Sequence, residues 1–164
     1  MGREYWVHHL NDLSGSPLIL MELLRKKMNK NEVTLVTNQG IGFLSPWNGS
    51  KVVISYTKYN GKILRFISLS IWYIKTAYFL LLKLRSGDHL VLSTLISSPL
   101  LIIQKLRSDI STEIRVNEVS FRVPLWRSMG LSLLNSEIVK KVYLSCFVRN
   151  SWRFAGPEQI EYPS

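Results

Sequence analysis

The chain has 164 residues, of which 46% are hydrophobic, and this length and composition favour one domain with a substantial buried core. Its 21 Lys and Arg residues outnumber its 11 Asp and Glu residues, giving a formal net charge of +10. Such a charge predicts an anionic partner: a nucleic acid, a membrane surface or a phosphorylated small molecule. The single cysteine, Cys146, excludes an internal disulfide framework and fits a reducing compartment. The first residues lack an apolar core, so we expect no signal peptide.

The opening segment, Tyr5 to Lys30, predicts a strand, a loop of small residues and an amphipathic helix with leucines at three- and four-residue steps. Pro17 suits the first helical position, and Ser14 or Ser16 could cap the free amides. This arrangement points backbone N–H groups and the positive end of a helix at whatever lies above the loop, so we expect an anion site there. The loop matches neither G-x-G-x-x-G nor a P-loop, so a plain tight turn is the alternative.

The remaining segments alternate between the two-residue periodicity of strands and the three- to four-residue periodicity of helices. We expect strands at 32–37, 51–57, 88–94, 113–116 and 141–145, and helices at 18–31, 63–85, 100–107 and 123–134, with a last helix or an irregular tail at 146–154. This alternation predicts an α/β fold, a Rossmann-like open and mostly parallel sheet with helices on both faces. Ligands of such sheets bind at the carboxyl ends of the strands, where loops 11–16, 95–98 and 117–122 should meet.

The positive charge is concentrated in residues 51–110. This part holds two acids, Asp88 and Asp109, against nine basic residues, a balance of 9 − 2 = +7: Lys51, Lys58, Lys62, Arg65, Lys75, Lys83, Arg85, Lys105 and Arg107.

The longest apolar segment, Ile63 to Arg85, approaches transmembrane length. Arg65, Lys75 and Lys83 interrupt it, and a charge near a bilayer centre costs roughly 2.5–3.5 kcal/mol. These three residues share one helical face with Trp72. We therefore expect an amphipathic helix with its broad apolar side in the core and a basic-aromatic stripe that could lie against a membrane surface. A plain core helix with solvated lysines and a true membrane span are the alternatives.

Polar residues with useful chemistry follow the strand at 113–116. Glu118 could act as a general base or bind sugar hydroxyls, and Asn117 offers an amide donor and acceptor. The guanidinium of Arg122 matches the geometry of phosphate or carboxylate. The alternatives are a surface ion pair of Glu118 with Arg115 or Arg122, and a solvated arginine.

Metal and nucleophilic chemistry find little support. His8 and His9 are adjacent, so they point to opposite faces of a strand and make a poor metal pair. His89 stands at a strand entrance, far from the ligand edge. Cys146 has no obvious activating partner, and the serines of the first loop lack the G-x-S-x-G context of a nucleophile. We expect neither a metal site nor self-contained catalysis.

Several motifs, in order and spacing, resemble the amino-terminal half of GT-B fold glycosyltransferases, a large retaining, family-four-like group that uses nucleotide sugars. The resemblance covers nearly the whole chain. The motifs that carry it are Asp12-Leu13-Ser14-Gly15-Ser16-Pro17, Glu32-Val33-Thr34-Leu35-Val36-Thr37, Gly40-Ile41-Gly42-Phe43-Leu44-Ser45, Asp88-His89-Leu90-Val91-Leu92-Ser93-Thr94, Val116-Asn117-Glu118-Val119-Ser120, which is similar to the family's V-H-E-x-S, and Val142-Tyr143-Leu144-Ser145.

The resemblance implies a Rossmann-like domain over residues 1–154 that binds a lipid-linked or glycan acceptor, followed by an interdomain linker or tail at 155–164. It implies a cytoplasmic, peripheral location at the inner face of the membrane, since anionic headgroups attract basic helices. The implied site residues are Ser14, Gly15 and Ser16 at the donor diphosphate, Asn117 and Glu118 in catalysis, Ser120 and Arg122 at the acceptor, and Arg65, Trp72, Lys75 and Lys83 at the membrane surface.

Two departures from the family shape the functional hypothesis. The family's donor-binding domain, with its paired-glutamate motif, has no counterpart in these residues, and Asn117 replaces the family's His with a side chain that cannot titrate near neutral pH. We therefore expect sugar transfer only with a donor-binding partner, using a nucleotide sugar as substrate and no cofactor. The alternative is a non-catalytic membrane-surface or scaffold protein on a degenerate transferase fold. Nucleic-acid binding is not expected, because the aromatic residues lie largely in apolar helices.

Overall fold

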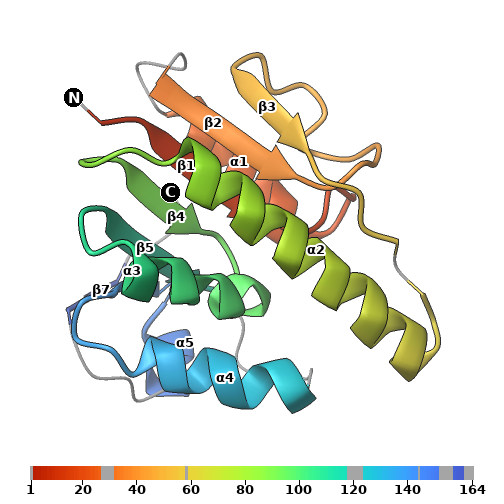
Figure 1. Ribbon diagram of the computed structural model, residues 1–164. Coiled ribbons are helices and arrows are strands. Elements are labelled where there is room, and N and C mark those ends of the chain that lie inside the picture. Colours follow the sequence, from red (N-terminus) through yellow and green to blue (C-terminus); the bar gives the residue numbers. More distant parts are fainter. Residues whose placement is uncertain are drawn as a thin grey trace.

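The computed structural model describes residues 2–26, 32–57, 59–117, 124–143, 145–151 and 157–160, without the side chains of 124–128 and 146–147. Its centre is one parallel sheet in the order β3-β2-β1-β4-β5-β6-β7 (Figure 1). The strands are β1 (Glu4–His8), β2 (Val33–Thr37), β3 (Ser50–Val53), β4 (His89–Leu92), β5 (Ser111–Val116), β6 (Lys140–Tyr143) and β7 (Glu158–Ile160). The helices are α1 (Gly15–Arg25), α2 (Lys62–Lys83), α3 (Ile102–Leu106), α4 (Pro124–Leu134), α5 (Cys146–Asn150) and the 3-10 helix η2 (Leu95–Leu101).

The central strand β1 is buried on both faces, because helices cover both sides of the sheet. Tyr5 and Val7 belong to the larger hydrophobic cluster, which includes α2 and η2. Trp6, between them, points to the opposite face and packs with Leu20 and Leu24 of α1. Alternate side chains of a strand face opposite sides of the sheet, so β1 contributes side chains to the hydrophobic cores on both faces. The predicted Rossmann-like α/β class is confirmed.

The order of the strands creates a crevice at one edge of the sheet. β1 pairs with β2 on one side and with β4 on the other. After β3, the chain returns through α2 to the other side of β1 and continues as β4 (Figure 1). The connections that follow β1 and β4 therefore run to opposite faces, which opens a space above the carboxyl ends of these two strands.

Helix α2 differs from the sequence prediction in the face that it buries. Its buried residues are Leu69, Trp72, Tyr73, Thr76 and Leu80, a narrow stripe against the sheet. The prediction that its broad apolar side lies in the core is wrong, because one sheet surface contacts only a narrow face of a helix and no second layer of the described residues covers the rest. The interpretation of Trp72 as a membrane-surface residue is also wrong, since its side chain is fully buried.

The two ends of the fold also differ from expectation. Helix α1 begins at Gly15 rather than Leu18, because Ser14 already takes the extended conformation of an N-cap.

Near the carboxyl terminus, the segment interpreted as a linker or tail contains β7, which extends the sheet by pairing with β6. The backbone N–H of Lys141 donates to the carbonyl of Pro157 at 2.9 Å, so this pairing satisfies polar groups that the edge of β6 would otherwise expose.

Candidate ligand pocket at the carboxyl edge

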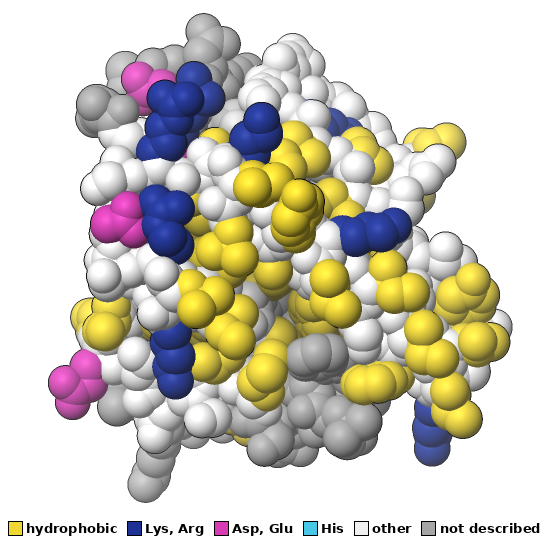
Figure 2. Space-filling model, in the orientation of Figure 1, with side chains coloured by type: hydrophobic (Ala, Val, Ile, Leu, Met, Phe, Trp, Pro, Cys, Tyr) yellow, Lys and Arg dark blue, Asp and Glu magenta, His cyan; other side chains and the backbone are white. Residues whose placement is uncertain are grey.

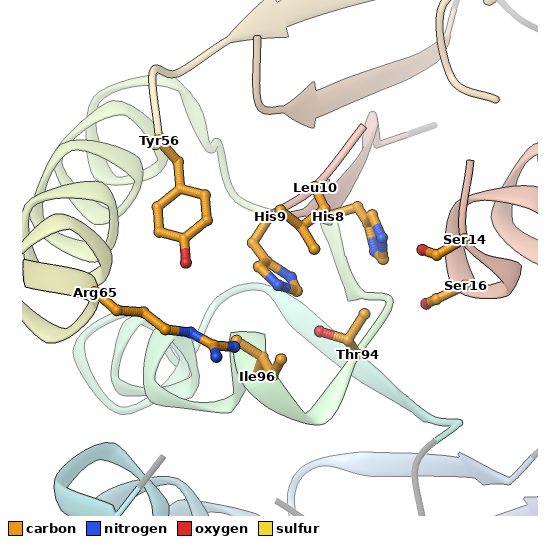
Figure 3. A pocket seen from close by; sticks show the side chains of 9 residues that line it. All are labelled: His8, His9, Leu10, Ser14, Ser16, Tyr56, Arg65, Thr94 and Ile96. Carbon is orange, nitrogen blue, oxygen red and sulfur yellow. The ribbon is translucent and has the colours of Figure 1, made fainter. Parts of the chain in front are cut away.

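A pocket occupies the crevice above the carboxyl ends of β1 and β4 (Figure 3). Segments that are distant in sequence contribute to it: the loop after β1, the start of α1, the segment after β3, the first turn of α2 and the segment after β4. Its lining residues are His8, His9, Leu10, Ser14, Ser16, Tyr56, Arg65, Thr94 and Ile96. Two of the three loops predicted to meet at this edge therefore do meet.

The start of α1 forms one wall of the pocket. The carboxylate of Asp12 accepts hydrogen bonds from the backbone N–H of Ser14, at 3.1 Å, and from the Ser14 hydroxyl. The Ser14 side chain is thus turned back toward Asp12 and makes no capping hydrogen bond to the helix, contrary to the prediction. Because Pro17 has no N–H, the first turn presents the N–H groups of Gly15 and Ser16 at the positive end of the helix dipole.

The space above Gly15 is open. A β-carbon built at this position would meet no other atom within 4 Å. Its conformation is ordinary, so neither packing nor backbone geometry within the described part of the chain requires a glycine here. The missing side chain instead leaves the helix N-terminus accessible to a ligand or to another protein surface.

Arg65 forms the opposite wall. Its side chain extends from the first turn of α2 into the pocket, across from Ser14 and Ser16 (Figure 3). It makes no ion pair or side-chain hydrogen bond with any other described residue, so its guanidinium donors are available to a ligand. Arg65 was predicted to lie in the membrane stripe; it lies at the pocket instead, because the first turn of α2 reaches the carboxyl edge of the sheet.

His8 lies at the inner wall of the pocket and was not predicted as a site residue. It is 1% exposed, and its Nδ1 lies 2.7 Å from the hydroxyl of Ser93. Its Nε2 is buried without a hydrogen-bond partner among the described residues. Burial lowers the pKa of His8 to about 4, and nearby Asp12 offsets only part of this effect. His8 is therefore neutral at pH 7.

Aromatic rings line the side of the pocket near α2. The His9 ring lies edge-on to Tyr56 and to Trp72, with centroid separations of 6.1 and 6.2 Å. The hydroxyl of Tyr73 donates to the carbonyl of Ile96, which ties the segment after β4 to α2. Burial raises the pKa of Tyr73, so this donor keeps its proton.

The predicted residues after β5 are only partly within the described structure. The side-chain amide of Asn117 donates to the carbonyl of Ser93 at 3.0 Å, so it holds the backbone of the residue whose hydroxyl contacts His8. Asn117 does not line the pocket. Glu118, Ser120 and Arg122 lie outside the described residues. Their proposed contacts, and a catalytic function of Asn117, remain predictions.

No family model and no curated protein matches the sequence. Among solved structures, the chain is similar to HepE (Alr3699) of Anabaena, in a crystal structure with UDP and glucose: the TM-score is 0.69 at 12% identity, over 99% of this chain and 44% of HepE. It is also similar to the apo form of the lipopolysaccharide outer core galactosyltransferase WaaB, with a TM-score of 0.59 at 10% identity, over 92% of this chain and 41% of WaaB. These likenesses show the shared Rossmann-like fold, and the chain spans less than half of either protein.

The buried state of His8 predicts how stability depends on pH. In the unfolded chain His8 binds a proton near its ordinary pKa of 6.5, whereas in the fold it does so only near 4. Its contribution to stability is complete above pH 6.5 and is lost as the pH falls toward 4, by up to about 3 kcal/mol. Urea unfolding at a series of pH values should show this loss in the wild type and a smaller one in His8→Asn. Identical pH profiles would contradict a buried neutral His8.

Proposed function

We propose that this chain is the acceptor-binding half of a GT-B glycosyltransferase and transfers a sugar from a nucleotide sugar when a donor-binding unit completes the cleft. The observation that carries this proposal is the pocket at the carboxyl edge, where the start of α1 faces Arg65. The switch between β1 and β4 is the place where open α/β sheets bind ligands. The fold shared with HepE and WaaB, one crystallised with UDP and glucose and the other a galactosyltransferase, supports the same reaction class.

The electrostatics of the pocket favour a ligand with an anionic group. The N–H groups of Gly15 and Ser16 at the helix start, together with the guanidinium of Arg65, provide donors from two sides. Helix N-termini bind phosphate through such groups, and arginine matches its geometry in a bidentate manner. The diphosphate of a nucleotide sugar, or the phosphate of a lipid-linked acceptor, has this chemistry.

Gly15 has a specific function in this proposal. Its open surroundings let a diphosphate held by the donor-binding unit approach the backbone of α1 closely. The family resemblance likewise implies that Ser14, Gly15 and Ser16 lie at the donor diphosphate. Glu118, and Ser120 with Arg122, complete the proposed set of sugar and acceptor contacts, while the amide of Asn117 donates to the Ser93 carbonyl and supports the pocket from behind.

The test is sugar transfer by this chain co-expressed with a GT-B donor-binding domain supplied as a separate chain. We expect labelled sugar to pass from UDP-glucose or UDP-galactose to a lipid extract only when both chains are present. Gly15→Val should reduce transfer by at least about tenfold without loss of stability, since the added side chain blocks the approach but enters open space in this half.

Gly61→Val is the matched control. Gly61 also has no atom within 4 Å of a built β-carbon, and it caps α2 without lining the pocket. This variant should keep the wild-type transfer rate. Absence of transfer with the supplied donor-binding chain, or equal rates for the two valine variants, would contradict the proposal.

A second observation favours a peripheral membrane location, whether or not the chain is catalytic. The outward side of α2 carries seven exposed hydrophobic residues, here called the α2 ridge: Ile63, Leu64, Ile67, Ile71, Ile74, Tyr78 and Leu82. Figure 2 shows hydrophobic side chains over α2, with Lys and Arg side chains beside them. A contiguous exposed patch of this kind marks a contact with a membrane or a partner protein.

The charges on α2 favour an anionic lipid surface among these occupants. Apart from Arg65, which faces the pocket, the helix contains Lys62, Lys75 and Lys83 and no Asp or Glu. An apolar face bordered by basic residues is the pattern of helices that lie in the membrane interface. By length and composition α2 could also span a bilayer, but Leu69, Trp72 and Leu80 on its inner side are packed against the sheet, so we propose surface contact.

Vesicle co-sedimentation tests this location. We expect binding to phosphatidylglycerol-containing vesicles that weakens with salt, and weak binding to pure phosphatidylcholine. Ile74→Ser should weaken binding by about fivefold because it removes apolar area from the contact. Ile138→Ser is the control, because Ile138 is similarly exposed (71% against 68%) but lies away from the α2 ridge. Equal losses in both variants would contradict insertion of the ridge.

A further inference from the structure

The hydrogen bonds around Ser93 fix which nitrogen of His8 carries its proton. The Ser93 hydroxyl lies 2.7 Å from the Val7 carbonyl, to which it donates, and 2.7 Å from Nδ1 of His8. A hydroxyl has one proton, so Ser93 must accept from His8, and Nδ1 carries the hydrogen. With the other tautomer, the hydroxyl and carbonyl oxygens would face each other at 2.7 Å with no proton between them.

The neutral ring then has a lone pair on Nε2. Burial keeps the imidazole uncharged, so Nε2 can only accept a hydrogen bond. This atom is buried in a residue that lines the pocket, and it has no partner among the described residues. Figure 3 shows the His8 ring extending toward the side of the pocket formed by Ser14 and Ser16. A buried acceptor without a donor is costly to leave unsatisfied, so a ligand that supplies a donor gains affinity.

From this geometry we infer that His8 is a specificity-determining residue, whose Nε2 accepts a hydrogen bond from a hydroxyl group of a sugar phosphate bound in the pocket. This inference rests on the proposed function, from which it takes the class of ligand. It adds the residue that accepts a hydrogen bond from the ligand's hydroxyl group. A lone pair repels an anion, so Nε2 selects for the hydroxylated part of the ligand. The phosphate faces the donors of Arg65 and the start of α1.

The network behind His8 extends to β5. Asn117 donates to the Ser93 carbonyl at 3.0 Å, and the Ser93 hydroxyl orients the imidazole at 2.7 Å. Ser93 and Asn117 are therefore positioning residues for His8: they hold the ring and its tautomer without lining the pocket. Side chains fixed in this way bind a ligand hydroxyl with little ordering cost.

The test compares the binding of glucose 1-phosphate and inorganic phosphate by isothermal titration calorimetry. We expect the wild type to prefer glucose 1-phosphate. His8→Asn keeps a donor for Ser93 but has no group at the position of Nε2. It should weaken glucose 1-phosphate binding about three- to tenfold and leave phosphate binding unchanged. His8→Gln, whose longer amide reaches toward the Nε2 position, should keep part of the preference. Arg65→Gln should weaken binding of both ligands.

A second measurement needs no variant and so does not depend on the folding of His8→Asn. Nitrogen-15 NMR of the wild type should show His8 protonated at Nδ1 and not at Nε2, with an Nε2 resonance that shifts on addition of glucose 1-phosphate but not of phosphate. An Nε2–H tautomer, a wild type that binds glucose 1-phosphate no better than phosphate, or a preference fully retained in His8→Asn would overturn the inference. Failure of sugar transfer with the preference intact would contradict only the proposed function.

Discussion

The pairing of β1 with β4 is the constraint on which the rest of this structure depends. β1 is buried on both faces and hydrogen-bonded on both edges, so its carboxyl end is held in place. The chain reaches β4 only after crossing the sheet through α2, which separates the connections that follow the two strands. The pocket lies at this separation, and its polar groups come from segments distant in sequence. Their positions relative to one another are therefore set by the sheet rather than by the loops themselves.

The same constraint explains the contrast in polarity within the pocket. His8 ends β1, so its ring is enclosed between the sheet and the segment after β4, where desolvation keeps it neutral. Arg65 is at the rim on a helix end, where solvent supports its charge. Gly15 and Ser16 add the positive end of a helix dipole. A neutral acceptor beside cationic donors suits a ligand that is anionic at one part and hydroxylated at another, as sugar phosphates are.

The layered fold was predictable from the sequence because period-two and helical segments alternate clearly. The face that α2 buries was not predictable, since both of its sides are rich in apolar residues and periodicity alone does not rank them. Trp72 illustrates this: its spacing matches Lys75, but the sheet surface accepts a narrow stripe that includes the ring. The strand β7 was missed because its three residues lie in a segment that reads as a linker.

The location of the candidate site could be predicted from the sequence better than the residues that form it. The start of α1 and the carboxyl edge follow from strand and loop order, so Ser14, Gly15 and Ser16 were found. His8 was missed because two adjacent histidines suggested only a metal pair, whereas its function depends on Ser93, 85 residues away. Arg65 was assigned to the membrane because its helical face was visible in the sequence and the position of its helix over the sheet was not.

The central claim is that the carboxyl-edge pocket binds a sugar phosphate group of the substrate. Backbone amide NMR during titration with glucose 1-phosphate tests it most directly. We predict the largest shift changes at Gly15, Ser16 and Ile96, with little change at the opposite edge around Gly87 and His89. Changes concentrated at the opposite edge, or no change at the pocket at saturating ligand, would contradict the account.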